Sequence, residues 1–259
     1  MKIGIALLPV AALFLSSTVF AESPFDGTWT LNTAKSHLAG DTIIYADAGN
    51  GMLKYTDSDQ TYTFKPDGSS FTTPMGTDRT FSKTGADSYT VTVKKGALLL
   101  RTTTIKESSD GNTLNEESKG TKPNGDTFDN TTTYVRTSPG SGLIGGWKST
   151  KVTLSSPNSI TIQTDGAEGV TLAISAVKAN CQAKWDGKDY PATGPTVSDG
   201  LTLAVTKTGA NGFKMVEKVK GKPIVILQYR AAADGKSLTV KGTNGQGTEP
   251  FTEVFEKQS

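Results

Sequence analysis

Short runs of β-branched and aromatic residues alternate with polar positions along nearly the whole chain. Thr, Val, Ile, Tyr and Phe recur in segments such as residues 87–93, 96–105 and 127–136. Such side chains pack well on the pleated surface of a sheet. No segment shows a sustained apolar repeat of 3.6 residues bounded by helix caps. The pattern therefore predicts an all-β protein.

Tight turns separate these runs. Asp-Gly and Asn-Gly pairs follow them at positions 67–68, 110–111, 124–125, 186–187 and 234–235. These pairs supply the positive φ values that two-residue hairpins need, so each strand should pair with the next in antiparallel fashion. Short strands joined by tight turns are typical of barrels and sandwiches. We predict two antiparallel β-barrels of about eight to ten strands each, with two β-sandwiches as the alternative.

The chain repeats itself at a spacing of about 120 residues. Trp29 and Trp147 are 118 residues apart, and the matching segments downstream keep the same order with offsets that reach 124 residues. The pairs are KPDGSSF with KWDGKDY, KTGADSYTV with KTGANGFKM, SSDGNTL with AADGKSL, and TTTYVR with FTEVFEK. A tandem duplication explains this order. It predicts one barrel over residues 22–137, a flexible linker at 138–142 and a second barrel over 143–259.

A Gly two residues before a Trp opens each half. In the first half these are Gly27 and Trp29. The Gly lets the chain turn inward without a Cβ clash, and the Trp offers a large apolar plate that can close one end of a barrel. A cation from the last strand can lie over the ring. We expect Arg136 to close over Trp29.

The second half has the same elements in Gly145, Trp147 and Lys257. Gly-x-Trp on the first strand with a basic residue on the last resembles the lipocalin and wider calycin pattern, and FDGTWTLNTAKS resembles the start of exported bacterial proteins described as lipocalin-like. The resemblance implies two closed barrels. It covers the ends of each half, whereas the middle is similar only in being a β-meander. Lys in place of Arg weakens the second match, and the paired disulfides of many animal members are absent. The alternative is that both Trp residues are ordinary core aromatics of sandwiches.

The first 21 residues have the features of a signal peptide. A positive start at Lys2 precedes an apolar run over residues 3–15, and Val19-Phe20-Ala21 ends the segment with a cleavage pattern. The run is short for a membrane span, so an uncleaved anchor is the less favoured alternative. We expect an exported protein, periplasmic or extracellular, with no stable membrane insertion.

Composition argues against several classes of function. The formal net charge is +2, without a basic stripe, so nucleic acid is not an expected partner. Cys181 is the only cysteine and should be a small buried hydrophobe, with a reactive thiol or an intermolecular bridge as the alternative. His37 is the only histidine, which argues against a multi-histidine zinc site, and we expect it in a surface loop. No nucleotide-binding loop is present, so no cofactor and no metal are predicted.

Two groups of acidic residues are candidates for acid–base chemistry. Glu116 and Glu117 are neighbours on a predicted strand and should point to opposite faces, so they cannot share a site. Phe251, Glu253 and Phe255 share one face of another strand. An acid among aromatics could line a pocket, but we prefer the interpretation that this face lies outside. No catalytic residue is assigned.

The strands of the second half are the more apolar of the two sets. The segment ALLLRTTTI of the first half corresponds to PIVILQYRA in the second. A pocket is therefore expected first in the second barrel, with Phe213, Met215 and Tyr229 as candidate ligand contacts.

Three functions follow as hypotheses. The barrel pattern without catalytic groups favours binding or carriage of a small apolar or amphipathic molecule outside the cytoplasm. A structural or interaction module of the cell envelope, with filled barrels, is the second. An enzyme of unrecognised type is the third, because some lipocalin-like barrels catalyse isomerisation or cyclisation; it would need a cluster of carboxylates with shifted pKa values in a pocket.

Overall fold

The computed structural model describes residues 23–58, 60–248 and 250–258, so the expected signal peptide lies outside the described residues. The described chain is all-β, as predicted, with one short 3₁₀ helix, η1, at Ser175–Val177. The first ten strands are β1 (Gly27–Leu31), β2 (Thr42–Gly49), β3 (Met52–Thr56), β4 (Thr61–Phe64), β5 (Asp67–Thr72), β6 (Asp78–Lys83), β7 (Ser88–Lys95), β8 (Leu98–Glu107), β9 (Thr113–Thr121) and β10 (Thr127–Arg136). The second ten are β11 (Gly145–Thr153), β12 (Ser159–Asp165), β13 (Gly169–Ile174), β14 (Ala179–Lys184), β15 (Asp186–Pro191), β16 (Leu201–Gly209), β17 (Gly212–Val219), β18 (Lys222–Ala231), β19 (Ser237–Asn244) and β20 (Phe251–Lys257).

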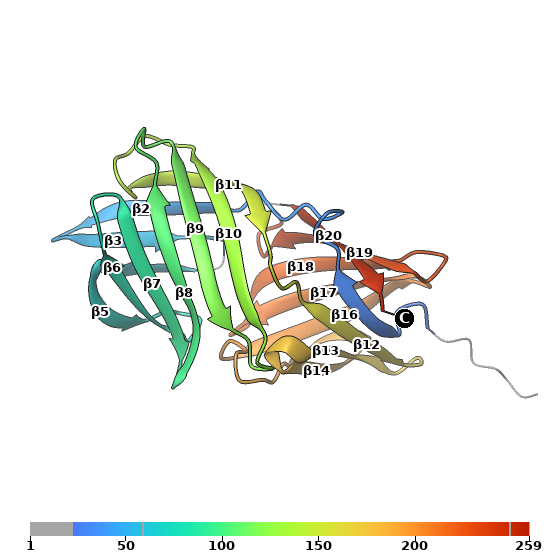
Figure 1. The fold of residues 1–259 in the computed structure, drawn as a ribbon. Helices are drawn as coiled ribbons and strands as arrows, with labels where there is room; N and C mark the ends of the chain where they lie inside the picture. The colour runs from blue at the N-terminus through green and yellow to red at the C-terminus, as the bar shows by residue number, and fades with distance from the viewer. Residues whose placement is uncertain (1–22, 59, 249, 259) are drawn as a thin grey trace, which may run out of the picture.

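The strands form two antiparallel ten-stranded sheets, each curled into a nearly closed barrel (Figure 1). The first barrel has the order β4-β3-β2-β11-β10-β9-β8-β7-β6-β5, and the second has the order β14-β13-β12-β1-β20-β19-β18-β17-β16-β15. Adding ten to each strand of the first order reproduces the second, apart from β1 and β11. The tandem barrel architecture is therefore confirmed, and the two copies share one topology.

The barrels exchange their first strands. β1 lies between β12 and β20 of the second barrel, where Trp29 pairs with Ile160 on one side and Lys257 on the other. β11 lies between β2 and β10 of the first barrel, where Trp147 pairs with Ile43 and Arg136. In Figure 1 the yellow-green β11 accordingly follows the green β10. The expected division at residues 138–142 marks the repeat in the sequence, but it does not delimit the two sheets, because each barrel takes its first strand from the other half.

Two segments carry the chain between the barrels. Residues 32–41 run from β1 to β2, and the backbones of His37 and Thr252 hydrogen-bond each other in this crossing. Residues 154–158 run back from β11 to β12, and the Lys122 Nζ donates to the Ser156 carbonyl at 2.6 Å. His37 is exposed, as expected of a surface loop.

The expected flexible linker is a tight loop of the first barrel instead. Residues 137–144 join β10 to β11, which are neighbours in one sheet. The backbone N–H of Gly146 donates to the Ser138 hydroxyl at 2.6 Å, and that of Thr137 donates to the Gly146 carbonyl at 2.7 Å. The small residues that suggested flexibility allow the chain to reverse closely here.

Each barrel has its own apolar core, and each core contains the Trp of the exchanged strand. Trp147 packs with residues of β2 to β10, including Tyr45, Phe81 and Leu114. Trp29 packs with residues of β12 to β20. Both indoles are fully buried. Each barrel therefore has its own core, and the strand that each core receives from the other half links the two barrels.

The first sheet ends at β4 and β5, which follow each other in the chain but share no ladder. Side chains cover this seam. The Arg79 guanidinium from β6 donates to the Tyr62 hydroxyl on β4 at 2.5 Å, and the Tyr62 ring contacts that of Phe71 on β5 at 5.5 Å between centroids. The first barrel is therefore closed by side chains where the backbone is open.

Candidate ligand-binding site

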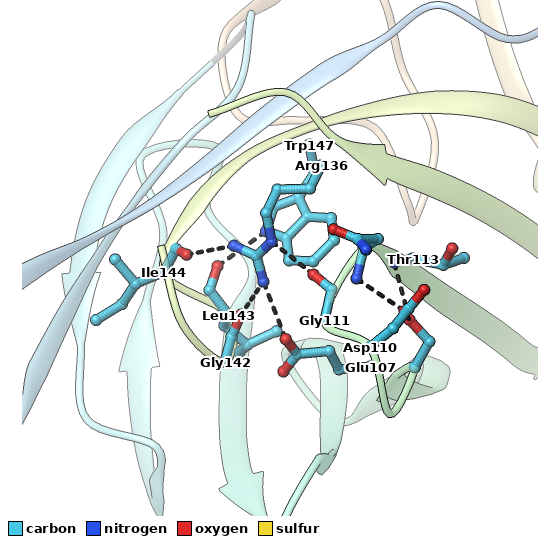
Figure 2. A network of polar contacts seen from close by, with 11 residues as sticks. Glu107, Asp110, Gly111, Thr113, Arg136, Gly142, Leu143, Ile144 and Trp147 are labelled. Atoms are coloured by element: carbon cyan, nitrogen blue, oxygen red, sulfur yellow. Dashed lines mark hydrogen bonds and ion pairs between the residues drawn. The ribbon is translucent and has the colours of Figure 1, made fainter. Parts of the chain in front are cut away.

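A basic side chain lies over each buried Trp, but the partners differ from those expected. The guanidinium carbon of Arg136 lies 4.0 Å from the ring centroid of Trp147 (Figure 2), and the ammonium nitrogen of Lys257 lies 5.6 Å from that of Trp29. The expected pairing of Arg136 with Trp29 and of Lys257 with Trp147 was wrong. The strand exchange is the reason, because it places each Trp beside the last strand of the other half.

Arg136 is held by four hydrogen bonds (Figure 2). It donates through Nε to the Gly111 carbonyl at 2.6 Å, through Nη1 to that of Ile144 at 2.7 Å, and through Nη2 to that of Gly142 at 2.8 Å. Its Nη2 also donates to Glu107 at 2.9 Å, and this ion pair is largely buried. The planar fork of Arg suits such a set of acceptors. This end of the first barrel is closed by a saturated polar network.

The corresponding end of the second barrel is more simply built. The Trp29 indole donates to the Phe25 carbonyl at 2.8 Å, as the Trp147 indole does to that of Leu143 at 2.9 Å. Lys257 is exposed, and the register of the strands places Ala231 at the position that Glu107 has in the first barrel. The second closure therefore lacks a buried ion pair.

The two motif glycines make room for these cations. Gly27 and Gly145 have φ values of 134° and 136°, which side-chain-bearing residues rarely adopt. A Cβ on Gly145 would lie 2.6 Å from the Arg136 Nη1, and one on Gly27 would lie 2.5 Å from the Lys257 Cε. The Gly-x-Trp motif thus has a structural role at the barrel ends, and neither indole faces a pocket.

A pocket of about 640 Å³ joins the interiors of the two barrels. The first barrel contributes inward-facing residues of β8, β9 and β10, which are Arg101, Thr103, Glu116, Ser118, Phe128, Asn130 and Thr132. The second contributes Leu31, Ile174, Val177, Glu217, Leu227, Tyr229, Glu253 and Phe255. The crossing segment and its flanks add Leu154, Ser156, Asn158 and Ile160, and the turn after β9 adds Lys122. A hollow of about 670 Å³ at the β16–β17 turn is similar in volume, but it is lined by the exposed Arg230 and Lys241. The pocket between the barrels is the candidate site, because apolar and charged side chains converge in it.

Two arginines face the inside of the first barrel. Arg79 of β6 and Arg101 of β8 both lie opposite Val93 of β7, so the three share one row across the sheet. Arg101 lines the pocket, and its side chain is exposed there. Protein atoms nevertheless surround it closely, so burial and the charge of Arg79 lower the pKa of Arg101. The two guanidinium groups therefore lie close enough for their charges to interact, and Arg101 is the one that lines the pocket.

Glu116 is the carboxyl group whose charge interacts with these two arginines. Burial raises its pKa, although Arg101, a hydrogen bond from Tyr134 and Arg79 act in the opposite direction. No ion pair within 4 Å joins it to either arginine among the described residues. Glu117 points outward and pairs with Lys119 at 2.8 Å. The expectation that Glu116 and Glu117 lie on opposite faces is confirmed.

Tyrosines surround the arginines. The rings of Tyr45, Tyr55 and Tyr62 contact one another in sequence, at 5.2 and 5.0 Å between centroids. Burial raises the pKa of Tyr62 to about 12 and those of Tyr45 and Tyr55 well above the ordinary value. These hydroxyls therefore stay protonated and neutral, so they can donate hydrogen bonds without adding charge.

Glu253 faces the inside of the second barrel. It lines the pocket between the barrels and an adjoining hollow of about 280 Å³, together with Phe255 in the first and Phe251 in the second. Burial raises the pKa of the Glu253 carboxyl. The preferred interpretation that this face lies outside was wrong. The alternation of side chains had placed the three residues on one face, but the sheet's curvature decides which face is inside.

The three candidate ligand contacts of the second barrel have different environments in the structure. Tyr229 lines the pocket, whereas Phe213 and Met215 are buried in the core. The Phe213 ring stacks on that of Tyr229 at 4.3 Å between centroids and supports it from behind. The pocket was expected first in the second barrel, but the first barrel supplies the basic residues of the site.

Cys181 is buried in the second core, as its interpretation as a small hydrophobe requires, and burial raises its thiol pKa to about 11. Within residues 23–58, 60–248 and 250–258, no three His, Cys, Asp or Glu side chains are grouped as metal ligands would be. In the same part of the chain, no helix is long and apolar enough to cross a membrane.

Comparisons with known proteins gave no relative. No family model matches the chain. No curated protein and no solved structure matches it either.

Proposed function

We propose that this chain is an exported, lipocalin-like protein that binds a small amphipathic molecule in the pocket between its two barrels. The observation that carries the proposal is the pocket itself, in which apolar side chains such as Leu31, Leu154 and Leu227 lie beside the charged groups of Arg101 and Glu253. A pocket of this volume, with an apolar wall and a few polar groups, suits a small molecule.

The lipocalin-like part of the proposal is supported by the doubled Gly-x-Trp motif and by a cation over each Trp in two nearly closed barrels. Export is supported by the sequence of residues 1–21 alone.

Filling the pocket should abolish binding. Thr132 lines the pocket from β10, whereas its neighbour Thr131 is exposed on the opposite face of the same strand. We expect the neutral fluorescent probe N-phenyl-1-naphthylamine to bind the wild type saturably. The Thr132→Trp variant should lose about tenfold or more in affinity, which corresponds to about 1.4 kcal/mol. Fluorescence titration measures both.

The matched control is Thr131→Trp, which adds the same ring to the outer face and should bind the probe as the wild type does. Native mass spectrometry of the gently purified protein is the second readout, because a carried ligand would add its mass. Absence of saturable probe binding to the wild type, or equal losses in the two variants, would contradict the proposal.

A further inference from the structure

Two arginines and one glutamate interact inside the first barrel. Arg79 and Arg101 face inward, and Glu116 is the carboxyl group that acts on both. Even a fully ionised Glu116 neutralises only one guanidinium, and burial favours its neutral form. Charges enclosed by protein are ordinarily paired, because desolvation without a partner is costly. Glu116 is therefore shared by two guanidinium groups.

The two guanidinium groups also have unused donors. The Arg79 Nε is buried and has no hydrogen-bond acceptor, although its Nη1 donates to Tyr62. Arg101 faces the pocket and forms no hydrogen bond or ion pair with any described side chain. Because both side chains extend from the same row, an oxygen-rich anion between them could accept from both.

The second barrel has the opposite pattern at the same places. The row that corresponds to Arg79, Val93 and Arg101 consists of Leu203, Glu217 and Val225. Likewise, Val240 pairs with Glu253 where Glu116 pairs with Thr132 in the first barrel. The basic groups thus belong to one copy only, and both acids of the other copy, Glu217 and Glu253, line the same pocket.

This polarity fixes a direction. An anionic group is attracted to the arginines of the first barrel, whereas the second barrel contributes no cation to the lining of the pocket. Leu31, Leu154, Ile160 and Leu227, with Lys122 beside the crossing segment, line the part between. Resting on the proposed function, we infer that each chain binds one amphipathic acid, with its carboxylate or phosphate between Arg79 and Arg101 and its apolar chain directed toward the second barrel. Two tandem barrels would thus share a single ligand.

Calorimetric titration of the full chain with dodecanoate, dodecyl phosphate and 1-dodecanol tests this inference. We expect one acid to bind per chain, at least about tenfold more tightly than the alcohol. Arg101→Gln should remove that advantage and leave the alcohol unchanged, because a charge-assisted hydrogen bond contributes only to the acids. The two acids distinguish a carboxylate from a phosphate ligand.

Lys106→Gln is the matched control. Lys106 lies on the same strand as Arg101 and is exposed, so its loss changes the net charge equally without touching the pocket. It should bind the acids as the wild type does. If Arg101→Gln does not fold by circular dichroism, Arg79→Gln replaces it, with the same expected loss.

The failures of the two proposals are distinguishable. Equal binding of acid and alcohol, two acids per chain, or unchanged acid binding in folded Arg101→Gln and Arg79→Gln would overturn the inference and leave amphipath binding intact. No binding of any of the three compounds, nor of the neutral probe, would overturn the proposed function and the inference with it.

Discussion

Replacing Trp147 with Ala should destabilise the first barrel by about 3–5 kcal/mol, the usual cost of removing a fully buried Trp. The indole is completely buried, and its Nε1 donates to the Leu143 carbonyl. The ring also supports the Arg136 guanidinium. A cavity and a loosened polar network would both follow from its loss. Urea denaturation with hydrogen exchange read by mass spectrometry measures the stability of each barrel separately.

Trp29→Ala is the matched variant, and the strand exchange predicts where its effect appears. Trp29 belongs to the N-terminal half of the sequence but packs in the core of the second barrel. We therefore expect protection to fall first in β12 to β20 for Trp29→Ala, and in β2 to β10 for Trp147→Ala. The reverse assignment would contradict the exchange.

Arg136→Ala should cost about 3–5 kcal/mol, whereas Lys257→Ala should cost about 1 kcal/mol or less. Removing Arg136 leaves Glu107, which is only 7 % exposed, without its ion-pair partner. The substitution also removes the hydrogen-bond donor of three backbone carbonyls. Lys257 is exposed and has no such acid. Urea denaturation of both variants tests the difference.

A double-mutant cycle provides the control. Because much of the cost of Arg136→Ala comes from an uncompensated Glu107, adding Glu107→Gln should recover part of it. Equal losses for Arg136→Ala and Lys257→Ala, or strict additivity with Glu107→Gln, would show that the ion pair does not stabilise this end.

The sequence predicted the strands, the duplication and the barrels, because these depend on local residue preferences. It did not predict which first strand joins which barrel. β1 and β11 present a Trp at the same register, opposite Ile160 or Ile43, so either barrel offers each strand an equivalent place. Which barrel each strand joins depends on the connections, namely a tight loop after β10 and a crossing segment after β11. The lengths of these connections do not show which strands they bring together.

The candidate site was likewise predictable from the sequence only where it depends on local alternation along one strand. The inward face of Arg101 follows from its alternation with the buried Thr103 and Ile105. Its closeness to Arg79 does not, because that depends on the register of two successive hairpins. Glu253 was misplaced because an acid between two aromatics fits either face of a strand until the curvature of the sheet is known.

Engineered disulfides test the strand exchange most directly. In a Cys181→Ala background, Thr28→Cys with Thr161→Cys joins two residues that face each other across β1 and β12, whose hydroxyls are now 3.0 Å apart. Paired strands bring their Cα atoms within disulfide range. Without exchange, Thr28 would instead face Ile44, which here faces Gly146. We expect the monomer to form the disulfide as Thr28→Cys/Thr161→Cys and to stay reduced as Thr28→Cys/Ile44→Cys, as read by mass spectrometry. The opposite result would contradict the strand exchange.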